Sequence, residues 1–438
     1  MEKRPRRSRK KEEYRIRTHL IHGNFDSKRW DYDHHVIPPI SASTTYRLSS
    51  AHRGAQGFVE FAHDEADGAG SLPIYVYDRL DEPTRGMLED NLAYAEGGET
   101  AVTFASGMAA ISAALGVTLS NQEEIVAHQV LYGCTYSLLT TWLPRCGVRT
   151  RFVDLCEPHT LRDAVTDRTR VVYFETPVNP TLQLIDIKAA RRVVEGLNAE
   201  RKKPIRIIVD NTFATPYCQR PLDHGADIVV HSLTKDIGGF GTDMGGAVVA
   251  PRELHGLLML YRKDFGAVLS PRSAWTFLVY GLPTLATRML NQQKSALKIA
   301  QFLERQPQVA RVCYPGLPAF PQYELATRQM VDYRGRFAPG SIIYFTLRGP
   351  DGGNRTAEAF IDYIAERSYS ITMAVSLGQI RTLIENPYSM THAALPEEEK
   401  RARGIEPGGI RLSVGLEDWQ DIIDDLAEAL EHVTGAAE

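Results

Sequence analysis

Short apolar runs recur through the middle of the chain, and helical stretches separate most of them. The runs cover residues 101–104, 125–127, 171–174, 205–209, 228–230 and 247–250. Continuous runs of this kind, rich in Val and Ile, are typical of strands that are buried on both faces. Their alternation with helices predicts an α/β fold with a mainly parallel sheet and helices on both of its faces.

Polar side chains follow the ends of these expected strands. Tyr132 follows one strand, Glu175 and Asn179 follow another, Asp210 ends a third, and Lys235 follows a fourth. In open α/β sheets, functional groups collect at the carboxyl ends of the strands. The sequence therefore predicts one functional site at this edge of the sheet.

Lys235 lies just past its strand, with Ser232 and Thr234 before it and a glycine-rich turn after it. A lysine at the mouth of a sheet becomes a nucleophilic amine if its surroundings favour the neutral form. Hydroxyl groups and flexible backbone suit a phosphate, so the motif suggests pyridoxal phosphate held as a Schiff base. A solvated surface lysine in a polar loop is the alternative that this motif alone leaves open.

Asp210 ends the apolar run Ile-Ile-Val. A buried carboxylate at this place needs a cationic partner. The protonated nitrogen of a pyridine ring is such a partner, and the pair keeps the ring electron-poor. An aspartate that caps the N-terminus of a helix is the alternative on the local pattern.

Two other parts of the chain could contact a phosphate. In residues 105–108 a strand leads through a Ser-Gly turn into a helix, where unpaired N–H groups and the helix dipole favour an anion. Tyr77 and Arg79 precede another helix, and both side chains can donate to a phosphate. An ordinary α/β turn and an ordinary surface arginine are the alternatives.

The pattern changes after Leu282, where a long helical region over 283–306 leads to a new strand at 342–345. We expect a smaller C-terminal domain there. Arg411 lies in an apolar strand of this region. A semi-buried arginine needs an anion, and its fork binds the carboxylate of an amino-acid substrate bidentately.

Length and composition exclude several classes of protein. The 438 residues are too many for one core, so two or three domains are expected. A net charge of −4 gives no reason to expect nucleic acid or a membrane surface as partner. The five cysteines form no CxxC pair, which fits a reduced cytoplasm. No apolar run is long enough to span a bilayer.

We expect four regions along the chain. Residues 1–17 should form a disordered basic tail. Residues 18–72 should form an N-terminal arm that lacks a long regular element and contacts a neighbouring subunit. Residues 73–285 should form the large domain that binds pyridoxal phosphate, and residues 286–438 the C-terminal domain.

From about Thr18 to Leu430 the chain resembles the Cys/Met-metabolism (trans-sulfuration) family of pyridoxal-phosphate-dependent enzymes. The resemblance implies a fold-type I transferase, with a mainly parallel seven-stranded sheet in the large domain and a smaller α/β C-terminal domain. It also implies an amino-acid substrate and a homotetramer of two catalytic dimers. We expect a cytoplasmic enzyme that uses no metal, nucleic acid or membrane.

The resemblance assigns cofactor roles to particular residues. Lys235 looks like the lysine that forms the Schiff base, Asp210 like the partner of the pyridine nitrogen, and Tyr132 like the ring that stacks on the cofactor. The other expected cofactor contacts in the same subunit are Gly107, Met108, Thr212, Ser232 and Thr234.

Further positions match the family in two other places. Tyr77 and Arg79 match the pair that reaches the cofactor phosphate of the neighbouring subunit. Ser376 and Arg411 match the site for the substrate carboxylate, to which we add Asn179.

Three segments are similar to those of methionine γ-lyases: residues 132–135, which include Cys134, then 262–271 and 305–323. The similarity implies γ-elimination, with L-methionine giving methanethiol, 2-oxobutanoate and ammonia. Lys235 would then move protons at Cα and Cβ. Tyr132, its pKa lowered by nearby positive charge, would protonate the leaving thiolate, and Cys134 would shape the pocket of that group.

Two departures leave the substrate open: Glu82 replaces the usual asparagine, and Arg381 stands where an acidic residue is usual. Arg381 is expected near the mouth of the substrate site. Cystathionine γ-lyase activity, γ-replacement as in cystathionine γ-synthase or O-acylhomoserine sulfhydrylase, and γ-elimination from a non-sulfur amino acid are the alternatives. A non-catalytic cofactor carrier, or a nucleic-acid-associated protein that uses the basic tail, is the alternative outside these enzymes.

Overall fold

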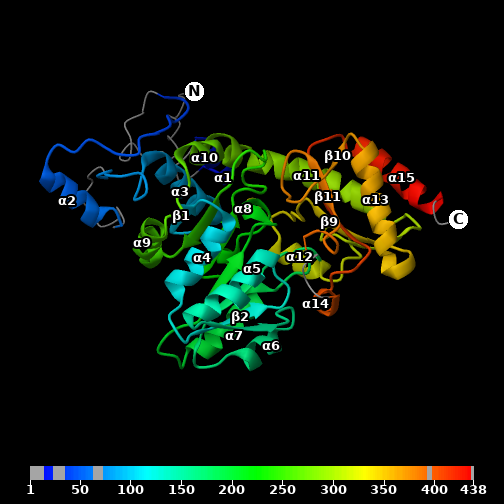
Figure 1. Ribbon diagram of the computed structural model, residues 1–438, viewed down its shortest axis with the longest axis horizontal. Helices are drawn as coiled ribbons and strands as arrows, with labels where there is room; N and C mark the ends of the chain where they lie inside the picture. The colour runs from blue at the N-terminus through cyan, green and yellow to red at the C-terminus, as the bar shows by residue number, and fades with distance from the viewer. Residues whose placement is uncertain (1–13, 23–34, 63–72, 392–396, 436–438) are drawn as a thin grey trace, which may run out of the picture.

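The computed structural model describes residues 14–22, 35–62, 73–391 and 397–435. Two sheets organise these residues (Figure 1): one occupies the centre of the molecule, and the other lies toward the C-terminus, on the right of the view. The expected disorder of residues 1–13 concerns a part of the chain outside these ranges.

The large sheet has seven strands in the order β1-β7-β6-β5-β4-β2-β3. Strands β6, β5, β4, β2 and β3 run parallel, whereas β7 is antiparallel to both of its neighbours. The strands are β1 (Thr100–Phe104), β2 (Glu124–His128), β3 (Arg149–Val153), β4 (Thr169–Glu175), β5 (Arg206–Asp210), β6 (Ile228–Ser232) and β7 (Gly246–Ala250). The predicted mainly parallel sheet is confirmed.

The central strands contribute to two cores at once, because successive side chains point to opposite faces of a sheet. In β5, Ile207 and Val209 pack into one core and Ile208 into the other. Helices α3 (Pro83–Glu96) and α7 (Ile187–Asn198) cover the first face. Helices α4 (Gly107–Thr118) and α9 (His255–Phe265) cover the second face. Burial on both faces explains why these strands are continuous apolar runs.

The C-terminal sheet has five strands in the order β10-β11-β12-β9-β8. The strands are β8 (Val309–Cys313), β9 (Ile342–Leu347), β10 (Ile371–Met373), β11 (Thr382–Glu385) and β12 (Gly409–Ser413). Helices α13 (Asn354–Arg367) and α15 (Trp419–Gly435) contribute to its core. The stripe of Ile422, Leu426 and Leu430 on α15 is buried there, as its helical spacing predicts.

Helix α11 (Leu282–Leu303) belongs to both cores. Leu285 and Met289 pack into the core of the large sheet, and Ile299 and Leu303 into the core of the C-terminal sheet. One continuous helix therefore links the two sheets. The predicted domain boundary between residues 285 and 286 falls inside this helix.

The N-terminal segment is more regular than expected. Helix α1 (Ile16–His22) begins within the expected tail, and Arg17 donates to the hydroxyl of Thr287 on α11 at 3.0 Å. Helix α2 (Ala51–Glu60) contradicts the expectation of an arm without a long regular element. Its start has an N-cap signal, because the Ser50 hydroxyl accepts the N–H of Arg53 at 3.1 Å. Figure 1 shows α2 at the far left, away from both sheets.

The remaining α-helices are short: α5 (Gly133–Ser137), α6 (Pro158–Ala164), α8 (Thr215–Cys218), α10 (Pro271–Thr276), α12 (Tyr323–Gln329) and α14 (Glu397–Ala402). Within the described ranges, the helices are all too short or too polar to cross a membrane.

Glu82, one of the departures from the family pattern, is the N-cap of α3. Its carboxyl group accepts the backbone N–H groups of Thr84, at 2.7 Å, and Arg85. The side chain is fully buried, and this burial raises the pKa of Glu82 to about 7. The glutamate therefore provides the hydrogen-bond acceptor for the free N–H groups at the start of the helix. At neutral pH its carboxyl group is partly protonated.

We predict that Glu82→Gln removes a pH dependence of stability. The unfolded chain loses the Glu82 proton near pH 4.5 and the folded chain near pH 7, so this group stabilises the fold most below pH 4.5 and progressively less up to pH 7. Relative to the wild type, the variant should gain roughly 1.4 kcal/mol per pH unit across this window. Urea unfolding at several pH values measures this gain. Glu200→Gln, an exposed control, should show no such trend, and a constant difference for Glu82→Gln would contradict the prediction.

Candidate active site

A cavity of about 400 Å³ lies at the carboxyl edge of the parallel strands, where the C-terminal sheet also contributes side chains. Most of the site residues predicted from the sequence line it: Gly107, Met108, Tyr132, Asn179, Asp210, Thr212, Ser232, Thr234, Lys235, Ser376 and Arg411. The polar residues at the strand ends therefore line one cavity, and their functional roles stay predictions.

Three predicted site residues do not line this cavity. Cys134 is exposed, with its Sγ 3.4 Å from the phenol oxygen of Tyr132. Tyr77 and Arg79 are exposed, and the guanidinium of Arg79 stacks 5.6 Å from the centre of the Tyr77 ring while it donates to the carbonyl of Lys263. A role for this pair in a neighbouring subunit stays a prediction.

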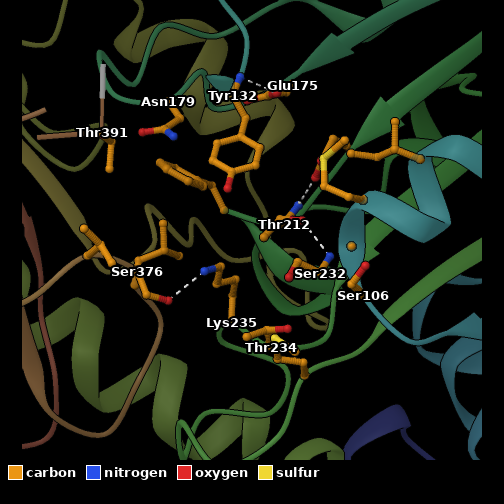
Figure 2. Close-up of a pocket in the computed structure, with 18 of the residues that line it drawn as sticks. Ser106, Tyr132, Glu175, Asn179, Thr212, Ser232, Thr234, Lys235, Ser376 and Thr391 are labelled. Carbon is orange, nitrogen blue, oxygen red and sulfur yellow. Dashed lines mark hydrogen bonds between the residues drawn. The ribbon is translucent and has the colours of Figure 1, made fainter. Parts of the chain in front are cut away.

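One end of the cavity combines the start of a helix with nearby hydroxyl groups. Helix α4 starts at Gly107, with Ser106 as its N-cap. A Cβ on Gly107 would lie only 2.8 Å from the Cβ of Ser232, so only glycine allows this close approach of helix and strand. Figure 2 shows Ser106 and Ser232 side by side at this end. Free N–H groups at the helix start and nearby hydroxyl groups could together hold a phosphate.

Asp210 is the last residue of β5 and points into the cavity. Its carboxylate accepts the N–H of Thr212 at 2.9 Å, and the hydroxyl of Thr212 accepts the N–H of Ser232 at 2.9 Å. Burial raises the pKa of Asp210. Among the described residues, Asp210 forms no ion pair, so its carboxylate suits a cationic group of a ligand such as a protonated ring nitrogen. The helix-cap alternative is wrong, because α8 begins later, with Ala214 as its N-cap.

Glu175 is a second carboxyl group of the cavity, and it stands opposite Asp210 in the register of β4 and β5. It accepts the backbone N–H of Tyr132 at 2.8 Å, which fixes the turn that carries the phenol ring. Burial and the neighbouring charge of Asp210 raise the pKa of Glu175 well above its usual value. The sequence placed Glu175 at a strand end but gave no signal for its contact with Tyr132.

The amine of Lys235 lies in the cavity and donates to the hydroxyl of Ser376 at 2.6 Å (Figure 2). Burial lowers the pKa of Lys235, and the positive charge of Arg411 lowers it further. These surroundings favour the neutral amine that a nucleophile requires.

Ser376 connects this amine to the predicted carboxylate site. Its backbone has a positive φ of 87°, which is unusual for a residue other than glycine. Its carbonyl oxygen accepts a hydrogen bond from Nη2 of Arg411 at 2.7 Å, and Nη1 of Arg411 donates to Asn179 at 3.1 Å. Hydrogen bonds therefore connect Lys235 through Ser376 to Arg411.

Arg411 already has an anionic partner that the sequence interpretation missed. Glu385 lies opposite it in the register of β11 and β12, with Oε1 3.0 Å from Nη2 of Arg411. The hydroxyl of Thr391, which lines the cavity, donates to the same oxygen at 3.2 Å. The buried arginine does have an anionic partner, as expected, but the protein itself supplies it.

The expected lowering of the Tyr132 pKa is wrong for the protein itself. The hydrogen bond with Cys134 and partial burial raise the pKa of Tyr132 to about 12, and these effects outweigh the opposing charge of Arg411. The phenol therefore keeps its proton at neutral pH. Arg381, the other departure from the family pattern, is exposed and does not line the cavity.

The mostly parallel sheet, with a half-buried lysine, an aspartate that has no ion-pair partner among the described residues and a helix N-terminus at its carboxyl edge, defines a fold-type I enzyme that depends on pyridoxal phosphate. The chain belongs to the family of Cys/Met metabolism PLP-dependent enzymes, whose model matches residues 17–431.

Comparison with known proteins agrees with this assignment. The chain is 40% identical over 397 residues to an L-methionine γ-lyase of Fusobacterium nucleatum subsp. polymorphum, which covers 90% of this chain and 93% of the relative. It is 37% identical over 419 residues to a cystathionine γ-lyase of Dictyostelium discoideum, covering 95% and 98% of the two chains. The crystal structure of cystathionine γ-lyase from Lactobacillus plantarum, complexed with L-serine, superposes with a TM-score of 0.83 at 32% identity and covers 96% of this chain and all of that one (100%).

The loop that carries Ser376 is held tightly at Gly378. Gly378 has φ +72°, and a Cβ there would lie 2.4 Å from the backbone nitrogen of Asp236. Its own N–H donates to the hydroxyl of Ser413 at 2.9 Å. The position of Ser376 therefore depends on the absence of a side chain two residues later.

We predict that Gly378→Ala destabilises the fold more than Gly335→Ala does. Gly335 has a similar φ of +71°, but a Cβ there would meet no atom of the described residues within 4 Å, so Gly335→Ala reports the backbone strain alone, on the order of 1 kcal/mol. Gly378→Ala adds a backbone clash to that strain. Urea unfolding of the two variants measures the difference, and equal losses would show that the loop is not held in this way.

Proposed function

We propose that the protein catalyses γ-elimination from a sulfur amino acid, with L-methionine and water giving methanethiol, 2-oxobutanoate and ammonia. The observation that carries the proposal is the link through Ser376, which holds the amine of Lys235 beside the guanidinium of Arg411. An amino acid whose carboxylate binds Arg411 would have its Cα within reach of Lys235. The 40% identity to an L-methionine γ-lyase favours methionine as the substrate.

The residues of the cavity fit pyridoxal phosphate. We propose that the start of α4 together with Ser232 and Thr234 holds the phosphate, and that Asp210 holds the protonated ring nitrogen. Two observations support these roles: the close approach at Gly107, and the carboxylate of Asp210, which has no ion-pair partner among the described residues. When bound, the cofactor supplies an electron-withdrawing ring that stabilises negative charge at Cα of the substrate.

The remaining steps use proton transfers by residues of this chain. Lys235, as a neutral amine, removes the proton from Cα and moves protons at Cβ. Tyr132 keeps its proton at neutral pH and donates it to the sulfur that leaves Cγ. Cys134, in contact with the phenol oxygen, limits the positions that this hydroxyl can take. Arg411 and Asn179 orient the substrate carboxylate.

We further propose that the active assembly is a homotetramer of two catalytic dimers, in which Tyr77 and Arg79 reach the phosphate site of the neighbouring subunit. Their exposure and their position outside this subunit's own cavity support the proposal. Arginine suits this contact because its fork binds phosphate oxygens bidentately.

We predict that the purified enzyme converts L-methionine to methanethiol, 2-oxobutanoate and ammonia in equal amounts. Colorimetric assays of thiol, keto acid and ammonia measure the three products. The same assays with cystathionine, homocysteine and O-acylhomoserines, with and without an added thiol, separate the alternatives. A new thioether amino acid in place of keto acid would show γ-replacement instead, and failure to turn over any sulfur amino acid would contradict the proposal.

We predict that Lys235→Ala lowers kcat by about 10³-fold or more, because the variant lacks both the cofactor-binding amine and the proton-transfer group. Steady-state kinetics measure the loss. Lys188→Ala, at an exposed position of α7, is the control and should keep the wild-type rate. Retention of the wild-type rate by Lys235→Ala would remove this residue from the mechanism.

A further inference from the structure

The arginine expected to bind the substrate carboxylate is already neutralised by a buried glutamate. Glu385 is fully buried, and Arg411 is 4% exposed. Their ion pair measures 3.0 Å, and Glu385 does not itself line the cavity. Glu385 therefore contacts Arg411 from outside the cavity, while Arg411 itself lines it.

Two ionisable side chains and one hydroxyl group act on Glu385. Arg411 lies on the adjacent strand β12, Lys235 follows β6, and Thr391, which follows β11, donates a hydrogen bond but carries no charge. With its carboxylate ionised, Glu385 and the guanidinium of Arg411 together have a net charge of zero. The pair leaves no uncompensated positive charge for an incoming anion.

A substrate carboxylate at Arg411 would place two anions on one buried guanidinium. A buried charge without a partner costs several kcal/mol, so a group in such a site changes its protonation state instead. The carboxylate of an α-amino acid is too acidic to accept the proton at neutral pH. Glu385 is the group that can accept it: burial raises the pKa of Glu385, and its Oε2 has no hydrogen-bond partner among the described residues.

We propose that Glu385 takes up one proton when a carboxylate ligand binds Arg411, so that substrate binding is coupled to proton uptake. Glu385 is in this account a positioning residue that acts through Arg411. The identity of the substrate in this inference rests on the proposed function, whereas the uptake of a proton does not. It makes this site favour monocarboxylate binding at lower pH: above the pKa of Glu385 in the free enzyme, affinity falls about tenfold per pH unit.

The test uses the holoenzyme and 4-(methylthio)butanoate, which is methionine without its amine and so cannot react with the cofactor. Isothermal titration calorimetry at pH 8, in two buffers of different ionisation enthalpy, counts the protons taken up per ligand bound. We expect Glu385→Gln to take up about one proton fewer than the wild type. We also expect the affinity of the wild type for this ligand to fall about tenfold per pH unit between pH 7 and 9. The affinity of Glu385→Gln should lack this fall.

Glu417→Gln is the matched control, because Glu417 also contacts β11 but accepts hydrogen bonds from Thr382 rather than from Arg411. It should retain the wild-type proton count. Equal proton uptake by the wild type and Glu385→Gln would overturn the proposal. If Glu385→Gln does not fold, the wild type alone decides, since an affinity for the ligand that does not fall with pH would also overturn it.

The outcome is separable from the proposed function. Turnover of methionine without the Glu385-dependent proton would contradict only this inference. Proton uptake by an enzyme that does not turn over methionine would leave the inference intact and contradict the proposed function.

Discussion

The contact between the amine of Lys235 and the hydroxyl of Ser376 is the interaction on which the site depends. It joins the end of β6, in the large sheet, to a loop of the C-terminal sheet. The backbone carbonyl of Ser376 in this loop also accepts a hydrogen bond from Arg411 on β12. Burial and the charge of Arg411 make protonation of the amine unfavourable, so the same contact that assembles the site also favours a neutral nucleophile. The same surroundings therefore determine both the position and the reactivity of the Lys235 amine.

The two-faced burial of the large sheet brings the other groups to this contact. Because helices cover both faces, polar side chains are accommodated where the strands end, and the ends of parallel strands share one edge. Asp210, Glu175 and Tyr132 all reach the cavity in this way. Helix α11 contributes to both cores and carries the chain from the large sheet to the strands that bear Glu385 and Arg411.

The parts of this structure that depend on local pattern could be predicted from the sequence. Lys235 and Asp210 follow apolar runs directly, so their place at the sheet edge needed no knowledge of distant contacts. Strand β3 was missed because it is a partly exposed edge strand whose sequence, Arg-Thr-Arg-Phe-Val, is not an apolar run. Glu385 was missed because its meaning depends on pairing with Arg411 across two strands, and no local pattern shows that register. The pKa of Tyr132 depends on packing against Cys134 and on burial, which spacing alone does not reveal.

The most direct test of the central claim is chemical trapping of the cofactor on its lysine. Borohydride reduction of the enzyme with bound pyridoxal phosphate, followed by peptide mass spectrometry, locates the lysine that carries the cofactor. We predict that the phosphopyridoxyl group is found on the peptide that contains Lys235, in near-stoichiometric yield. A label on a different lysine, or no label on an enzyme that is fully active, would contradict the account.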